Sequence, residues 1–198
     1  LDVDGTLYSL RRMAWRTWWT MLPVADLFRD LQRVREQMRG ADPVEDFRRE
    51  QAIRLAAVRG ISREDAARQI EALIQRWTRL FARLRLHRGV RDTLLQLHQR
   101  GVRLGIVSDY PASGKLAGLG LEDLPFQAIT VAEEVGALKP HPDAFLRAVE
   151  QLDASPGRVL HVGDREDCDV AGARGAGMRT ARFYPGRKRV ASRADVVF

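Results

Sequence analysis

The chain opens with LDVDGTLYSL, residues 1–10, and this stretch decides the fold because it places two carboxylates at the end of a predicted strand. Asp2 and Asp4 are one residue apart, and alternate side chains of a strand point to the same face. Their negative charges repel each other unless a cation lies close by. The pair therefore predicts a metal site, a proton-transfer pair, or both.

From about Leu86 onward, short apolar runs alternate with amphipathic helical segments. The apolar runs include LGIV (104–107) and RVLHV (158–162), and the helical segments include GVRDTLLQLHQR (89–100) and PDAFLRAVEQL (142–152). Continuous apolar runs are typical of strands that are buried on both faces of a parallel sheet. We therefore expect an α/β fold with a doubly wound, Rossmann-like parallel sheet.

Residues 9 to about 84 have an almost wholly helical pattern, which predicts an α-helical insertion after the first strand. Trp15, Trp18, Trp19 and Leu22 fall at i, i+3, i+4 and i+7 and form one apolar stripe. We expect this stripe to be buried packing, with a short membrane-surface helix as the alternative. The predicted division is a catalytic core of residues 1–8 and 85–198 and a helical cap of residues 9–84.

The chain begins without methionine, enters its first motif at residue 2, and ends on ADVVF (194–198), which predicts a strand. We therefore expect a fragment that is shortened before residue 1, and we leave open whether it is also shortened after residue 198. Most of the first strand would then be missing. Asp2 would then lack hydrogen-bonded support in the middle of the sheet. Whether the shortened chain is active is therefore left open.

The positive charge of the chain raises the question of a nucleic-acid partner. The 198 residues carry a formal net charge of +7, and the sequence pI is near 10.4. Clustered cations bind phosphate backbones, but nearly all of this charge is arginine scattered among acidic residues. The dense basic run is RFYPGRKRVASR (182–193). The scattered pattern favours solvated helix faces, so we do not expect a nucleic-acid partner.

Other features of the composition concern location. No run of about 18 apolar residues occurs, so we expect no membrane span. The acidic start does not fit the basic region that opens a signal peptide. A single cysteine, Cys168, excludes an internal disulfide and indicates a reducing, cytoplasmic location. The sequence does not indicate an oligomeric state.

Polar side chains follow the predicted strands at their carboxyl ends. Ser108 and Asp109 follow LGIV, Asp164 follows RVLHV, and Lys139 precedes a helix in GALKPHP (136–142). Ligands of open α/β sheets bind outside the carboxyl ends of the strands. We therefore expect these side chains to meet the two opening acids at one rim of the sheet.

This set of side chains is typical of phosphoryl transfer. A carboxylate such as Asp2 can attack phosphorus, and Mg²⁺ binds through carboxylates while it contacts a substrate phosphate. Ser108 and Lys139 can supply a hydroxyl and a cation that stabilise the charge of the transferred group. Asp4 is close enough to protonate the leaving oxygen, and Thr6 can cap the tight turn that follows.

Four motifs in order along the chain carry a resemblance to a known family. They are DVDGT (2–6), Ser108 at the end of LGIVS, Lys139 in GALKP, and GDREDCD (163–169). Together they span the whole chain, and on them the chain resembles the phosphohydrolases of the haloacid dehalogenase superfamily. The resemblance implies a Rossmann-like core with a helical cap, Mg²⁺ as cofactor, and a small-molecule phosphate ester as substrate.

The resemblance also implies a role for each matching residue. Asp2 would be the nucleophile that forms an aspartyl-phosphate, and Asp4 would be the general acid and later the general base for water. The phosphoryl group would be held by Ser108, by the backbone N–H of Asp109 and by Lys139, which would also orient the nucleophile.

The metal site and its supports follow from the same resemblance. Mg²⁺ would be bound by Asp2, Asp164 and the main-chain carbonyl of Asp4. Asp169 would support the metal as a ligand, through water or through Lys139. The chain departs from the family at Asp109, where asparagine is common, and there we expect activity to survive.

Three alternatives to a phosphatase remain at this point. A phosphomutase is one, and a phosphonate hydrolase is the second, although the family's phosphonate cleavers use a cap lysine and residues 9–84 contain none. Dehalogenation is disfavoured because Asp4 supplies a proton donor that halide departure does not need. The third alternative is a noncatalytic basic binding module, whose binding would fall steeply with salt and be indifferent to Asp2→Asn.

Overall fold

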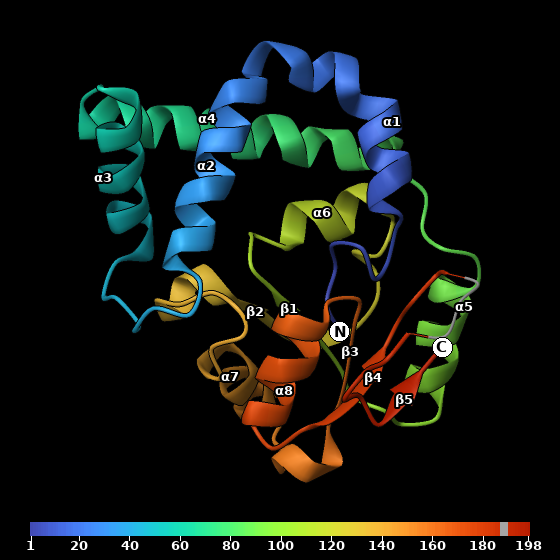
Figure 1. Ribbon diagram of the computed structural model, residues 1–198. Coiled ribbons are helices and arrows are strands. Elements are labelled where there is room, and N and C mark those ends of the chain that lie inside the picture. Colours follow the sequence, from blue (N-terminus) through green and yellow to red (C-terminus); the bar gives the residue numbers. More distant parts are fainter. Residues whose placement is uncertain (187–189) are drawn as a thin grey trace.

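The computed structural model describes residues 1–186 and 190–198 (Figure 1). Residues 187–189, which belong to the dense basic run near the C-terminus, lie outside the described residues. The helices are α1 Leu10–Met21, α2 Ala25–Met38, α3 Phe47–Arg59, α4 Arg63–Leu80, α5 Val90–Gln99, α6 Ser113–Gly118, α7 Asp143–Gln151 and α8 Ala171–Gly175. The strands are β1 Leu104–Ser108, β2 Phe126–Val131, β3 Leu160–Gly163, β4 Arg179–Arg182 and β5 Val196–Val197.

The strands form two parallel groups that the N-terminal segment joins. β1 pairs with β2, and β3, β4 and β5 pair in that order. Between the groups, the carbonyl of Leu1 accepts a hydrogen bond from the N–H of Val107, and the N–H of Asp2 donates to the carbonyl of Val162, both at 2.9 Å. The expected α/β fold with parallel strands is confirmed. The support that we expected Asp2 to lack is present on both sides.

Helices cover both faces of this sheet, which explains the continuous apolar runs. On one face, Leu94 of α5 and Leu116 of α6 pack with Ile106 of β1. On the other face, Phe145 of α7 and Ala173 of α8 pack with Val107. Neighbouring residues of β1 therefore point into different hydrophobic clusters, as the alternation of side chains along a strand requires.

The N-terminal helices α1–α4 stand over one edge of the sheet (Figure 1). Leu31 and Val34 of α2, Leu55 of α3 and Leu73 of α4 belong to a further hydrophobic cluster, which Leu138 of the loop before α7 joins. The two connections between this region and the sheet run side by side: Tyr8 pairs with Leu86 in an antiparallel bridge. The division into a cap of residues 9–84 and a core stays a prediction.

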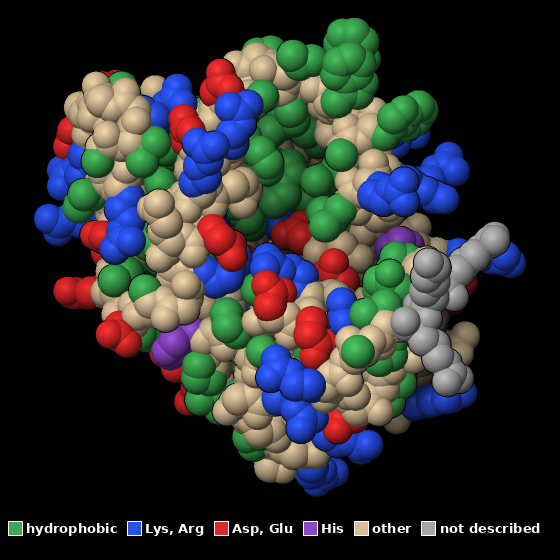
Figure 2. All heavy atoms as spheres, in the orientation of Figure 1, with side chains coloured by type: hydrophobic (Ala, Val, Ile, Leu, Met, Phe, Trp, Pro, Cys, Tyr) green, Lys and Arg blue, Asp and Glu red, His purple; other side chains and the backbone are tan. Residues whose placement is uncertain are grey.

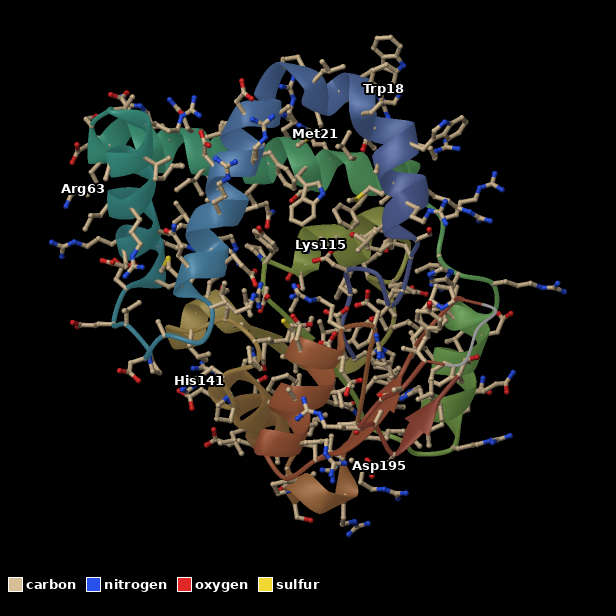
Figure 3. All side chains as sticks on the ribbon, in the orientation of Figure 1. Trp18, Met21, Arg63, Lys115, His141 and Asp195 are labelled. Atoms are coloured by element: carbon tan, nitrogen blue, oxygen red, sulfur yellow. The ribbon has the colours of Figure 1, made fainter. Side chains whose placement is uncertain are left out.

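The predicted burial of the tryptophan stripe on α1 is wrong. The exposed fractions are 77% for Trp15, 45% for Trp18, 70% for Trp19 and 53% for Leu22. Figure 3 shows Trp18 pointing away from the rest of the molecule. Residues two apart lie on opposite sides of a helix, so Thr17 lies opposite Trp15 and Trp19. Thr17 is buried, and its face of α1 is therefore the one that turns inward.

Among the described residues, no helix is both long enough and apolar enough to cross a bilayer.

Candidate active site

The chain turns sharply after Asp2 and Asp4, and this turn lies at the predicted rim. Gly5 has φ +97°, a conformation that side chains other than glycine rarely adopt, and it faces Asp164. A Cβ atom on Gly5 would lie 2.3 Å from Oδ2 of Asp164. Glycine at this position therefore allows the opening loop and the loop after β3 to approach each other.

Lys139 connects two buried carboxylates at the centre of the site. Its ammonium donates to Oδ1 of Asp2 at 2.6 Å and to Oδ1 of Asp169 at 2.7 Å. The three residues are exposed by 4% or less. The second oxygen of Asp2 accepts a hydrogen bond of 2.8 Å from the hydroxyl of Thr6. Both oxygens of the predicted nucleophile are therefore held in fixed positions.

The two carboxylates bound to Lys139 differ in their pKa values. Burial raises the pKa of Asp2 to about 7, against the opposing attraction of Lys139. Burial also disfavours the charge of Asp169, but Lys139 and the hydrogen bond from His161 outweigh it and lower the pKa of Asp169. The same two carboxylates keep the pKa of Lys139 well above its usual range although burial opposes this. The lysine is therefore a permanent cation in the site.

His161, inside β3, supports Asp169 from the sheet. Its Nε2 lies 3.2 Å from Oδ1 of Asp169, and its ring meets Phe145 edge to face. Burial lowers the pKa of His161 to about 4, against the hydrogen bond to Asp169, so the imidazole is neutral at pH 7. It is a buried structural histidine, in agreement with its position inside a strand.

The neutral state of His161 predicts a stability that depends on pH. Its folded pKa lies below the ordinary value of 6.5, so the unfolded chain binds the proton more strongly and stability falls as pH drops below 6.5. The contribution of this residue to the free energy of unfolding should fall by about 2 kcal/mol between about pH 7 and pH 5. Urea unfolding in EDTA measures it.

The matched variants are His161→Gln, which should show a weaker pH dependence than the parent chain, and His98→Gln, which removes an exposed histidine of α5. Equal pH dependence in the parent chain and His161→Gln would contradict the prediction.

Three carboxylates at the rim are arranged so that they fit a divalent metal. Oxygen atoms of Asp2, Asp164 and Asp169 lie within 4.8 Å of one another. Oδ1 of Asp164 is buried and has no hydrogen-bond partner among the residues that the structure describes. Burial, with the charge of Asp169, raises the pKa of Asp164 to about 6. A buried carboxylate oxygen without a donor, beside two further carboxylates, fits Mg²⁺, which prefers oxygen ligands.

The side chain of Asp4 is not part of this metal group, and it has partners of its own. The hydroxyl of Tyr8 donates to Oδ1 of Asp4 at 2.6 Å, and the ammonium of Lys115 bonds Oδ2. Tyr8 therefore contacts a predicted catalytic residue. The predicted role of the Asp4 main-chain carbonyl as a metal ligand stays a prediction.

Lys115 is one of the residues of the site that the sequence did not predict. It lies on α6 beneath the helical region, and it is exposed by 1% (Figure 3). Its ammonium lies 4.5 Å from the ring centre of Trp77 and 5.1 Å from that of Tyr110. A cation buried against aromatic faces is stabilised by their quadrupoles, and its bond to Oδ2 holds the side chain of Asp4 in position.

Lys115→Met is expected to lower the kcat for an alkyl phosphate by roughly 100-fold, because a displaced acid protonates the leaving oxygen poorly. The loss should be smaller with p-nitrophenyl phosphate, whose leaving group needs little protonation. Methionine keeps the length and the apolar stem, so it fits the aromatic surroundings. Steady-state kinetics with the two esters measures the difference. An equal loss with both would contradict a role in positioning Asp4.

The predicted phosphate-binding residues occupy the remaining side of the rim. Ser108 is fully buried at the end of β1, where its Oγ accepts a hydrogen bond of 3.4 Å from the N–H of Tyr110. The carboxylate of Asp109 accepts from the N–H of Lys139 at 3.0 Å and from Arg39, just after α2, at 2.9 Å. The extra negative charge at Asp109 is therefore neutralised by a cation from the helical region.

A second arginine from the helical region, Arg35 of α2, also reaches the rim. Arg35 is exposed by 1%, pairs with Glu133 at 2.9 Å and donates to the carbonyl of Asp109 at 2.7 Å. Its guanidinium also stacks 3.7 Å from the ring centre of Tyr110. Arg35 and Arg39 are only four residues apart in the sequence, but the acids they meet are far along the chain. In Figure 2, carboxylates and cations gather in the hollow below the helical region.

The structure brings the predicted residues together in two adjoining groups. One group is the metal-binding set with its lysine, and the other is Asp4 with Tyr8 and Lys115. The phosphate-binding side adjoins the first group, because Asp109 bonds the backbone of Lys139. Their catalytic roles are predictions that this geometry supports.

Comparison with known proteins places this geometry in a family context. The sequence model of the haloacid dehalogenase-like hydrolase family matches residues 1–177 of this chain. A glyceraldehyde 3-phosphate phosphatase of Methanopyrus kandleri is 31% identical over 94% of this chain and 83% of its own length. A 5-amino-6-(5-phospho-D-ribitylamino)uracil phosphatase of Escherichia coli is 32% identical over 93% of this chain and 82% of its own length.

A solved structure shares the fold. CbbY from Rhodobacter sphaeroides, in complex with xylulose-(1,5)bisphosphate, superposes with a TM-score of 0.71 at 20% identity, and the match covers 100% of this chain and 91% of that chain. At this identity the likeness concerns the fold alone.

Proposed function

Since this chain belongs to the haloacid dehalogenase-like hydrolases, we propose that it is a Mg²⁺-dependent phosphatase that hydrolyses a small phosphorylated metabolite through an aspartyl-phosphate. The observation that carries the proposal is the buried Asp2–Lys139–Asp169 chain beside Asp164. The two similar phosphatases act, by their names, on small phosphorylated compounds, and this supports the substrate class.

In the first step, the carboxylate of Asp2 attacks the phosphorus atom and the ester bond to the leaving oxygen breaks. Thr6 and Lys139 hold the two oxygens of Asp2, so the attacking atom is oriented before the substrate binds. Asp4 gives a proton to the leaving oxygen. The products of this step are the free alcohol and an aspartyl-phosphate.

In the second step, Asp4 takes a proton from a water molecule as that water attacks the phosphorus. The bond between phosphorus and Asp2 breaks, which releases inorganic phosphate and regenerates the carboxylate. Lys139 and Ser108 stabilise the negative charge on the phosphoryl oxygens in both steps. Asp109, already paired with Arg39, contributes its backbone N–H.

Mg²⁺, bound by Asp2, Asp164 and the carbonyl of Asp4 with support from Asp169, would supply positive charge to a substrate phosphate in a site rich in carboxylates.

Metal removal tests the proposal with two readouts. EDTA should abolish hydrolysis of p-nitrophenyl phosphate, and added Mg²⁺ should restore it. Mg²⁺ should also stabilise the fold, by about 2.7 kcal/mol when its concentration is 100 times its Kd, because it binds the folded state. Calorimetric unfolding with and without Mg²⁺ measures this second effect.

Asp164→Asn should lose both the activity and the stabilisation. The control is Asp167→Asn, because Asp167 is an exposed acid that pairs with Arg165 and lies outside the metal-binding set. Stabilisation of Asp164→Asn equal to that of the parent chain would contradict the metal site, and turnover in EDTA would contradict the Mg²⁺ dependence.

A further inference from the structure

The exposed apolar residues of α1, with Leu22 directly after it, form a surface that we call the α1 patch: Leu10, Trp15, Trp18, Trp19 and Leu22. Their exposed fractions run from 41% to 77%. Figure 2 shows hydrophobic side chains gathered over the outer side of α1. Single exposed apolar residues are normal, but a contiguous patch with three tryptophans marks a surface that contacts something else.

Arginines surround the α1 patch without acidic neighbours. Arg11, Arg12 and Arg16 lie on the helix itself, and the segment 9–25 contains no aspartate or glutamate. Arg83 and Arg85 come from the segment that returns from the helical region. In the part of the chain that the structure describes, no carboxylate pairs with any of these five, although most other arginines are paired. Their charge is therefore available to an anion from outside.

Four of these arginines line a cavity of about 620 Å³ beside the patch, and Trp15 belongs to both surfaces. The lining residues are Tyr8, Ser9, Arg12, Trp15, Arg16, Arg83, Leu84 and Arg85. The volume is in the range of small-molecule sites. Guanidinium groups bind phosphate through paired hydrogen bonds, so the chemistry of the cavity suits a phosphate diester or monoester.

We propose that α1 docks on an anionic phospholipid surface, with lipid phosphates in the arginine-lined cavity and the tryptophans in the interfacial layer. Tryptophan rings are favoured at that layer, and basic residues are attracted to anionic lipid at about 1 kcal/mol each. This role uses neither the carboxylates nor Lys139, although the cavity adjoins the active site through Tyr8, which lines the cavity and donates to Asp4.

Charge favours a lipid surface over a second copy of the chain. A two-fold dimer formed through the α1 patch would place the same surface on both sides of the contact. The unpaired arginines of one copy would then face those of the other, in a chain that carries +7 overall. An anionic surface complements both the arginines and the net charge, and it accepts the tryptophans without a pocket to receive them.

Vesicle binding by the full chain tests the proposal. The chain should sediment with vesicles of phosphatidylglycerol and not with vesicles of phosphatidylcholine, and the tryptophan emission should shift to the blue on binding. Trp15→Ser with Trp19→Ser should weaken binding by at least about tenfold, because the rings leave the interface. Arg83→Gln with Arg85→Gln should weaken it roughly 30-fold.

Matched controls remove the same groups elsewhere. Ile53→Ser with Val58→Ser replaces exposed apolar residues of α3, and Arg147→Gln with Arg158→Gln removes two exposed charges at the other end of the molecule. Both should bind phosphatidylglycerol vesicles as the parent chain does. Circular dichroism melting establishes that every variant is folded.

Other outcomes overturn the proposal in distinguishable ways. Equal binding by the tryptophan variant and its control would mean a purely electrostatic contact. Competition by free glycerol phosphate at low concentration would mean a site for a soluble anion. A dimer in light scattering that Trp15→Ser with Trp19→Ser dissolves, without vesicle binding, would mean that the patch joins two copies.

Discussion

Asp2→Asn is expected to reduce the kcat for p-nitrophenyl phosphate by about 10⁴ or more, because an amide cannot form the aspartyl-phosphate. The substitution keeps the size of the side chain and its hydrogen bond from Thr6, so the fold should survive. Initial rates in Mg²⁺ measure the loss. The substitution also removes a negative charge beside Lys139, and we expect this to change the thermal midpoint of unfolding only slightly.

Two comparisons make this result specific. Asp4→Asn should also lose activity. With a substrate whose leaving group needs little protonation, however, this variant should still form the aspartyl-phosphate. Acid quenching and mass spectrometry can detect that phosphate on Asp2. Asp167→Asn, next to the site but exposed, should keep full turnover. A phosphorylated Asp2→Asn protein, or one with turnover near that of the parent chain, would refute the proposed mechanism.

Lys139→Met is expected to lower the free energy of unfolding of the metal-free protein by about 3–5 kcal/mol. The lysine is the shared partner of Asp2 and Asp169, which are exposed by 4% and 1%, so its removal leaves buried carboxylates without their cation. Denaturant unfolding in EDTA measures the change. Hydrolysis should be lost at the same time, because the phosphoryl charge is no longer offset.

A second substitution separates these two effects of Lys139. In Lys139→Met with Asp169→Asn, one of the unpaired carboxylates is removed, so most of the lost stability should return. Activity should not return, because the cation beside Asp2 is still missing. If the double variant is no more stable than Lys139→Met alone, the buried charge is not the cause of the destabilisation.

The sequence predicted the rim of the site because strand ends are a local and strong signal. LGIV and RVLHV have the apolar character of buried parallel strands, and the residue that follows such a strand must lie at the carboxyl edge of the sheet. Ser108 and Asp164 could therefore be placed without knowledge of the remaining contacts.

The surroundings of Asp4 could not be predicted in this way. Lys115 is a single lysine in a six-residue helix, and nothing in its immediate neighbours distinguishes it from a solvated side chain. Lys115 is buried beside Asp4 because Trp77 of α4, which is far away in the sequence, packs over its ammonium. Contacts of this kind depend on how helices pack, which local patterns do not encode.

The error at α1 has a related physical reason. The spacing i, i+3, i+4 and i+7 shows that Trp15, Trp18, Trp19 and Leu22 share a face, but it does not show whether that face meets protein or solvent. Here Met13 and Met21 pack against the hydrophobic core on the other side. Two faces of one helix were apolar, and only one could turn inward.

Leu1 and Asp2 bond to both halves of the sheet, and this has a consequence for how the enzyme loses function. Asp2, the proposed nucleophile, belongs to the segment that holds the two groups of strands together. Asp2 keeps its position only while both halves of the sheet are in place, so separation of the halves would displace it. Inactivation and unfolding should therefore be a single event, with superimposable denaturation curves for turnover and for ellipticity.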